Sequence, residues 1–232
     1  ANEIQPHYEQ WEKDAWMPRE FWNKLGENGL LCVDQPEQYG GVGVPFQYSM
    51  VILNEMAKLG LSSLATGVSV HSDICAPYVE HLGSQAIKDY WLPRMASGEA
   101  VAAIGMTEPG AGSDLAVIRT SAVRDGDHYV LNGSKTFISN GQHADIIIMA
   151  VKTDPSAGAK GVSLLLVDTS LPGFNKGKKL EKMGLQSQDT SEMFMDNLSL
   201  PVDCLLGQEG KGFAYLMTEL PNEPLKLAVI AV

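Results

Sequence analysis

The feature that most constrains the fold of this chain is a change of hydrophobic period near residue 101. Before that point the apolar residues recur every three or four positions, as on one face of a helix. After it they gather in short β-branched runs that are separated by Gly, Pro and Asp. Such a chain is expected to be an α+β protein of several domains, with helices first and strands after them.

The first hundred residues predict a series of helices. Pro18 fits the first turn of a helix that ends before Gly29, because a first turn leaves its amides free in any case. The apolar residues of Gln47–Leu59 follow the helical period most clearly. Residues 62–82 are mostly apolar or small and predict a buried helix, and Ser84 offers an N-cap for the next one.

The second part predicts antiparallel strands in a sandwich or barrel. Asn132-Gly133 lies between two alternating runs and predicts a hairpin, because Asn-Gly supplies the positive φ of a type I′ turn. Asn140-Gly141 precedes a further β-branched run. The additional strands are expected at 145–151, 162–167 and 192–200. Beyond Pro201 the pattern is helical again.

These patterns divide the chain into three parts. We expect a helical domain over residues 1–100 and a β-domain over residues 101–205. Residues 206–232 are expected to begin a helical-bundle domain that is incomplete here, because the final sequence LAVIAV is apolar and carries no helix cap.

The charge balance limits the partners of the chain. Its 28 acidic and 17 basic residues give a formal net charge of −11, which would repel nucleic acid and anionic membrane surfaces. The longest apolar runs are far too short to cross a bilayer, and the polar start lacks the apolar core of a secretory signal. Three widely spaced cysteines fit a reducing compartment. We expect a soluble protein without membrane insertion and without nucleic-acid partners.

The polar residues give no sign of a metal site. The five histidines lack ligand spacing such as HxxxH, so no metal is expected. His128 and His143 are interpreted as surface residues of strands. Glu108 and Asp114 are better explained as turn residues than as an acid and a base.

One glycine cluster could hold an anion. Gly110-Ala-Gly112-Ser113-Asp114 fails as a dinucleotide fingerprint, because Leu115 stands where its last glycine should be. Its two glycines nevertheless let backbone N–H groups approach an anion, and Ser113 adds a hydroxyl donor. When the cluster is considered alone, a tight turn between strands is the favoured explanation.

Four blocks in order resemble the acyl-CoA dehydrogenase family. They are GMTEPGAGSD (105–114), LNGSKTFISNG (131–141), KMGLQSQDTSE (182–192) and LGQEGKGF (206–213). The resemblance covers essentially the whole chain, and it is closest to the long-chain enzymes through KMGLQSQDTSE and the later ELPNE.

The resemblance implies a fold and an activity. It implies a helical domain, a middle β-domain and a C-terminal four-helix domain that this chain lacks. The implied reaction is the FAD-dependent α,β-dehydrogenation of an acyl-CoA thioester to a trans-2-enoyl-CoA, with electrons passed to an electron-transferring flavoprotein. A homotetramer is implied for the full-length protein, in the mitochondrial matrix of a eukaryote or the cytoplasm of a bacterium.

The resemblance also assigns residues to FAD. Those at the pyrimidine edge of the flavin are Ile104, Met106 and Thr107. Gly112 and Ser113 would meet the pyrophosphate, and Ser113 would also lie near the acyl-CoA. The residues covering the dimethylbenzene and N5 side are Phe137, Ile138 and Ser139, with Phe137 where the family often has Trp. The alternative for Phe137 is a core residue of a strand.

The catalytic base is assigned to Glu223 by the same resemblance, with Pro221 and Asn222 beside it at the substrate. The family's Arg after this Glu is Pro224 here, which supplies no cation. Glu223 could instead be a first-turn residue that favours the helix dipole. Two alternatives therefore stay open: a truncated or degenerate member with a binding or structural role, and a relative that passes electrons to oxygen.

Overall fold

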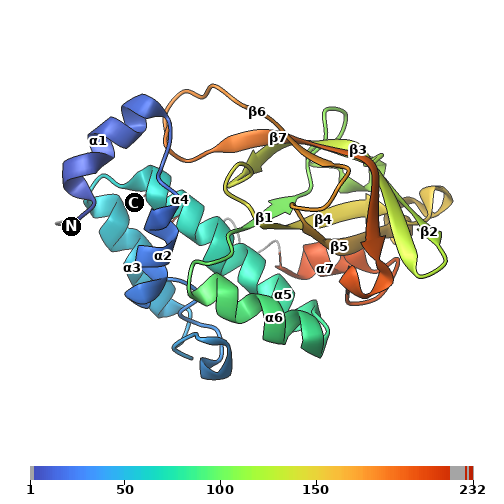
Figure 1. The fold of residues 1–232 in the computed structure, drawn as a ribbon, viewed down its shortest axis with the longest axis horizontal. Coiled ribbons are helices and arrows are strands. Elements are labelled where there is room, and N and C mark those ends of the chain that lie inside the picture. The colour runs from blue at the N-terminus through green and yellow to red at the C-terminus, as the bar shows by residue number, and fades with distance from the viewer. Residues whose placement is uncertain (1–2, 220–227, 229, 232) are drawn as a thin grey trace.

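The helical part comes first in the structure, a computed structural model that describes residues 3–219, 228, 230 and 231 (Figure 1). Its helices are α1 (Gln5–Asp14), α2 (Glu20–Glu27), α3 (Gln47–Lys58), α4 (Ser62–Val68), α5 (Ala76–Leu82) and α6 (Gln85–Ala96). The strands are β1 (Ala102–Gly105), β2 (Ser121–Asp125), β3 (His128–Ser139), β4 (Ile146–Lys152), β5 (Val162–Asp168), β6 (Phe174–Lys179), β7 (Thr190–Pro201) and β8 (Leu205–Leu206). A short helix, α7 (Gly212–Glu219), follows them. The expected fold class is confirmed.

Local signals placed the helices well. α2 begins at Glu20, so Pro18 lies just before the first turn rather than within it, and its carbonyl accepts from the Phe21 amide. Gly29 follows the helix with φ +63°, as expected. The Ser84 hydroxyl accepts from the Ile87 amide at 3.3 Å, so the expected N-cap is confirmed. In α3 the helix is confirmed, but Val51, like other residues of its apolar stripe, is exposed.

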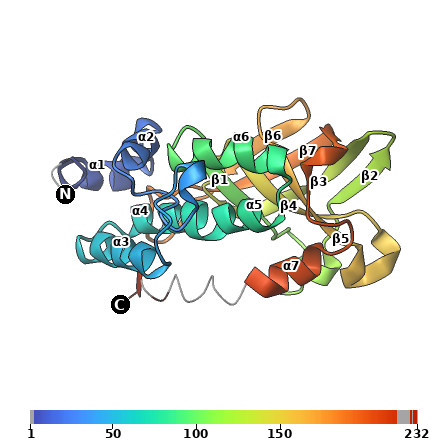
Figure 2. The same ribbon diagram turned by 90° about the horizontal axis from the view of Figure 1, so that it is seen from below.

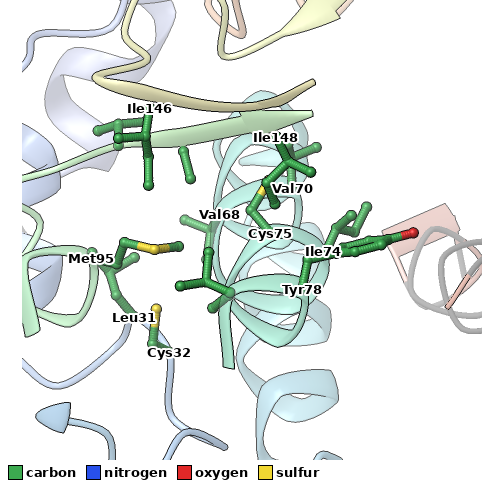
Figure 3. Packing of buried hydrophobic residues seen from close by; sticks show 14 of the residues in the cluster. Leu31, Cys32, Val68, Val70, Ile74, Cys75, Tyr78, Met95, Ile146 and Ile148 are labelled. Atoms are coloured by element: carbon green, nitrogen blue, oxygen red, sulfur yellow. The ribbon is translucent and has the colours of Figure 1, made fainter. Parts of the chain in front are cut away.

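A buried helical segment packs against both β1 and α6. Residues 62–82 form α4, a π-helical segment η2 (Ser69–Cys75) and α5 without a break. All seven residues of η2 are buried. Figure 3 shows Val70 beside Ile148 of β4, with Leu31 and Met95 closing the core farther along the helix. The wider turn of a π-helix is not visible as a period in the sequence, so this segment was not predicted.

His71 ties the buried helix to its surroundings. Its Nδ1 accepts from the Ala102 amide at 3.0 Å, so its Nε2 carries the hydrogen and donates to the Met95 carbonyl oxygen at 3.0 Å. The Trp22 ring meets its edge at 5.3 Å. Burial lowers the pKa of His71 from 6.5 to about 4, because the charged imidazolium would lose its hydration in the core, and the charge of Arg19 adds to this shift.

This neutral histidine predicts a loss of stability in acid. His71 takes up a proton near pH 6.5 in the unfolded chain but only near pH 4 in the folded chain. The stability that the neutral His71 contributes is therefore fully present above pH 6.5 and is lost as the pH falls toward 4. We expect the free energy of unfolding to decrease by about 3 kcal/mol across this window. Urea unfolding at a series of pH values measures it. His71→Gln should remove this part of the pH dependence, whereas His7→Gln, at an exposed site, should keep it. Equal pH dependence in the wild type and His71→Gln would contradict the assignment.

The strands form one mixed sheet around β4. The order is β6-β7-β3-β2-β4-β5-β8, and most pairs are antiparallel as expected. β1 and β2, however, both run parallel to β4, β1 along Ile146–Met149 and β2 at Lys152. All residues of β4 are buried, because alternate side chains enter two cores, one against the helices and one shared with β3 and β7.

The predicted hairpin at Asn132-Gly133 is wrong. β3 runs through both residues, and the turn lies instead between Asp125 of β2 and His128. At Gly133 an added Cβ would lie 2.7 Å from the Thr120 Cα, and the pairing with β7 shifts register there. The glycine therefore serves a close approach of two backbones within a bulged strand rather than a turn.

The remaining elements close the ends of the sheet. β6, with its lysines, and the two-residue β8 were not expected, because neither has a continuous β-branched run. α7 packs against β5, which Figure 2 shows from below. Among the described residues, no helix is long and apolar enough to span a bilayer.

Candidate functional site

The segment after β1 is a tight turn with an exposed tip. The Glu108 amide donates to the Ala111 carbonyl at 2.8 Å, and the Ala111 amide donates back at 3.1 Å. Gly110, Gly112 and Ser113 are exposed, and an added Cβ at either glycine would meet no atom within 4 Å. The geometry therefore leaves open space beside backbone amides, which suits an anionic group.

Asp114 ends the segment as a cap. Its side chain accepts from the Ala116 amide at 3.0 Å and begins the short helix η3 (Leu115–Val117). The interpretation of Asp114 as a turn residue is confirmed.

A second segment lies directly beside the first. The Thr136 amide in β3 donates to the Thr107 carbonyl at 2.9 Å, and the Lys135 ammonium donates to the Met106 carbonyl at 3.1 Å. The two sequence blocks at 105–114 and 131–141 are thus adjacent in space, which brings together the two groups of residues that the sequence assigned to one ligand.

Phe137 projects from a strained backbone. Its φ is +59°, a conformation that L residues other than Asn and Asp rarely adopt, and its side chain is 66% exposed. The alternative that Phe137 is a core residue is therefore wrong. The pairing with β7 shifts register between Lys135 and Ile138, and this bulge turns Ile138 inward, 2% exposed, and Phe137 outward. Strain of this kind is typical of a ligand site.

The other predicted site residues surround these two segments. Ile104, Met106, Thr107 and Ser139 are half-buried, so each retains a surface that a ligand could contact. Ile104 and Met106 also pack against the helical core. Glu223, Pro221, Asn222 and Pro224 lie outside the described residues.

Glu108 and Lys135 form a buried ion pair beneath the site. Their Oε1 and Nζ atoms are 2.9 Å apart, with 6% and 0% of the side chains exposed. Burial would raise the pKa of Glu108, but Lys135 and the hydrogen bonds at its carboxylate outweigh this and lower it. Burial lowers the pKa of Lys135 to about 8, and Glu108 opposes part of this shift. The expectation that Glu108 is only a turn residue was incomplete.

His143 was wrongly expected at the surface. Its side chain is 2% exposed, with Nδ1 2.6 Å from an Asp189 carboxylate oxygen and Nε2 2.8 Å from the Met17 carbonyl. The Trp16 ring stacks on it at 4.3 Å. Its partners are far away in sequence, so no local pattern could show its burial. His128 is exposed, as expected.

The described part of the chain holds no group of three or more His, Cys, Asp or Glu side chains suited to a metal ion.

Two sequence profiles identify the architecture. The profile of the acyl-CoA dehydrogenase N-terminal domain matches residues 1–99, and that of the acyl-CoA dehydrogenase middle domain matches residues 103–198. The chain belongs to the acyl-CoA dehydrogenase family. Together the two matches include both segments of the candidate site.

Individual acyl-CoA dehydrogenases support this membership. The long-chain specific acyl-CoA dehydrogenase of Sus scrofa mitochondria is 44% identical over 232 residues, 99% of this chain and 54% of the relative. The crystal structure of acyl-CoA dehydrogenase from Geobacillus kaustophilus superposes with a TM-score of 0.94 at 53% identity, covering 97% of this chain and 60% of that one. A glutaryl-CoA dehydrogenase from Mycobacterium smegmatis in complex with FADH2 gives a TM-score of 0.89 at 32% identity, covering 98% and 57%. The chain thus spans about half the length of the curated relatives it matches.

Sequence reasoning missed Lys135 within the candidate site of this acyl-CoA dehydrogenase family member. A signal was present, since Lys135 has the same strand parity as the buried Tyr129 and Leu131. A lysine at an inward position needs a partner, which pointed to a buried acid.

Proposed function

We propose that this chain carries the flavin-binding part of an FAD-dependent acyl-CoA dehydrogenase. The observation that carries the proposal is Phe137, an exposed aromatic ring on a left-handed backbone beside the 104–107 segment. The assignment of FAD to this place comes from the family. The FADH2 in the related glutaryl-CoA dehydrogenase structure supports it at the level of the fold.

The residues of the site fit this cofactor. A flavin ring needs a flat apolar cover, which Phe137 supplies, and hydrogen-bonding groups at its pyrimidine edge, which the half-buried Thr107 can supply. A pyrophosphate needs donors with open space before them, and Gly112 and Ser113 are exposed at such a place. We therefore assign Ile104, Met106 and Thr107 to one edge of the ring, and Phe137 and Ser139 to its other side. Ile138 is assigned to that side through its backbone alone, because its side chain is buried in the core.

The proposed reaction divides between the cofactor and the chain. Bound FAD supplies a hydride acceptor for the β-hydrogen of the acyl group, and a carboxylate must remove the α-proton. We propose that Glu223 is the carboxylate that removes this α-proton. Pro221 and Asn222 are assigned to positions beside the substrate, and Ser113 to a position near the acyl-CoA. Pro224 follows Glu223 and cannot supply the cation that the family places there. We expect the CoA portion to be held differently as a result.

The partners follow from the same proposal. The proposed product is a trans-2-enoyl-CoA. We propose that the full-length protein is a homotetramer and that its reduced FAD passes electrons to an electron-transferring flavoprotein. The competing proposal is a member with only a binding or structural role, which the loss of the Arg at Pro224 favours.

An anaerobic titration with acyl-CoA of several chain lengths tests the function. The intact gene product, purified with FAD, should lose its visible flavin absorbance on addition of at least one saturated acyl-CoA. The matching trans-2-enoyl-CoA should leave that absorbance in place, since its α,β-bond is already a double bond and cannot be dehydrogenated again. A flavoprotein that no saturated acyl-CoA bleaches would support the competing binding role instead. A protein that binds no FAD would contradict the flavin site itself.

A further inference from the structure

Two flavin-facing segments of the proposed site are joined by one buried ion pair. Glu108 directly follows Thr107 in the first segment, and Lys135 lies two residues before Phe137 in the second. From this arrangement we infer that Lys135 and Glu108 are positioning residues, which set the distance and register between the two surfaces that would face FAD. This inference rests on the proposed function.

The Lys135 ammonium holds the first segment at two points. It donates to the Met106 carbonyl at 3.1 Å and to the Glu108 Oε1 at 2.9 Å. Met106 and Thr107 are residues that the proposal places at the pyrimidine edge of the flavin. The Met106 carbonyl is bonded to Lys135, and the Thr107 carbonyl is bonded to the Thr136 amide. These two hydrogen bonds fix the orientation of the peptide groups that follow Met106 and Thr107.

Glu108 is itself held in a single orientation. Its Oε1 also accepts from the Thr120 amide at 3.0 Å, and its Oε2 accepts from the Arg119 amide at 2.6 Å. A carboxylate with these partners cannot rotate without losing hydrogen bonds. Lys135 is therefore anchored to the backbone of residues 119–120 as well as to the turn.

The bulge in β3 gives this anchor its importance. Between Lys135 and Ile138 the strand leaves its register with β7, and the Thr136 amide donates to Thr107 instead. At this point the strand is aligned by the 106–108 segment rather than by the sheet. The strained backbone of Phe137 starts immediately after this contact, so the ion pair lies where the direction of the aromatic ring is decided.

Burying two charges is costly, and a pair of apolar residues would often give equal or greater stability. Removing both charges can therefore restore stability without restoring the hydrogen bonds that position the two segments, so variants can distinguish a positioning role from a stabilising one. In Lys135→Met the Glu108 carboxylate loses its cation, so both stability and FAD binding should fall. In the double variant Lys135→Met/Glu108→Gln no charge is buried, and the Gln carbonyl can still accept from one of the two amides.

The test measures the FAD dissociation constant, the thermal midpoint and the visible circular dichroism of bound FAD in the intact gene product. Lys135→Met is expected to weaken FAD binding about 10- to 100-fold, the value of a charge-assisted hydrogen bond. The double variant should recover most of the thermal midpoint while FAD binding stays weak and the dichroism of the bound flavin stays altered.

Lys152→Met is the matched control. Lys152 is also a buried strand lysine, 5% exposed, and it donates to the carbonyl of Gly158, which is not assigned to the flavin. This variant should lower the thermal midpoint with little change in the FAD dissociation constant. The inference is overturned if FAD affinity returns together with stability in the double variant, or if Lys152→Met weakens FAD binding equally. A wild type that binds no FAD would instead refute the proposed function.

Discussion

Replacing Glu223 by glutamine is expected to abolish the bleaching of bound FAD by acyl-CoA. Glutamine has nearly the size of glutamate but cannot take up the α-proton, and loss of a positioned general base typically costs about 10²- to 10⁴-fold in rate. The visible spectrum of the bound FAD should stay unchanged, because the proposal gives Glu223 no contact with the flavin. Anaerobic stopped-flow mixing with a saturated acyl-CoA measures the rate of bleaching.

Glu219→Gln is the control for this experiment. Glu219 is four residues earlier, and its carboxylate lies 3.0 Å from the His81 Nδ1 on α5. This variant should bleach at close to the wild-type rate, since its carboxylate has a partner at the surface of the helical part. Bleaching that persists in Glu223→Gln would show that the base is another residue of the gene product.

Replacing Gly98 by alanine is expected to destabilise the fold by about 2 to 5 kcal/mol, the sum of two effects. Gly98 has φ +75°, which disfavours any side chain. An added Cβ would also lie 2.1 Å from the carbonyl oxygen of Trp22, and backbone atoms cannot move aside as a flexible side chain does. Trp22 is fully buried in the helical core, so the displacement would extend into that core. Urea unfolding near neutral pH measures the loss.

Gly60→Ala separates the two effects. Gly60 also has φ +75°, but an added Cβ there meets no atom within 4 Å. This variant should therefore cost only about 1 to 2 kcal/mol, the preference of the backbone alone. Equal losses at the two positions would mean that the contact with α2 is not what requires glycine at position 98.

The elements that sequence predicted correctly are those with local signals. Pro18, Ser84 and the glycines after α2 and α3 act within one turn of the residues they affect, so the boundaries beside them were found to within about two residues, whereas α1 had no such signal. β4 and β5 were found because each is a largely apolar run of strand length. The position of Asn132-Gly133 was misjudged, because Thr120 requires a glycine there and its contact with Gly133 is not visible in a local window.

The same distinction applies to the candidate site. The blocks at 105–114 and 131–141 were identified by resemblance, and their adjacency in the structure agrees with a shared ligand. The buried state of His143 was not found, because Asp189 and Met17 contact it from distant parts of the chain. Lys135 was missed although its strand parity indicated an inward side chain, because its partner Glu108 was interpreted only as a turn residue. Whether Glu223 acts as the base stays a prediction.

The pairing of β3 with β7 has a consequence for how the chain folds. Its register joins Ser139 to Thr190 and His128 to Pro201, with β4, β5 and β6 between them in sequence. The β4–β5 and β6–β7 pairs close much shorter loops and can form first, whereas β3 pairs with β7 only after the long segment between these two strands has been ordered. Topologies dominated by such distant pairings fold in milliseconds to seconds rather than microseconds. Before β7 pairs with β3, the backbone N–H and C=O groups on that edge of β3 can pair with a strand of another chain. Slow formation of the β3–β7 pair therefore makes the folding intermediate prone to aggregation.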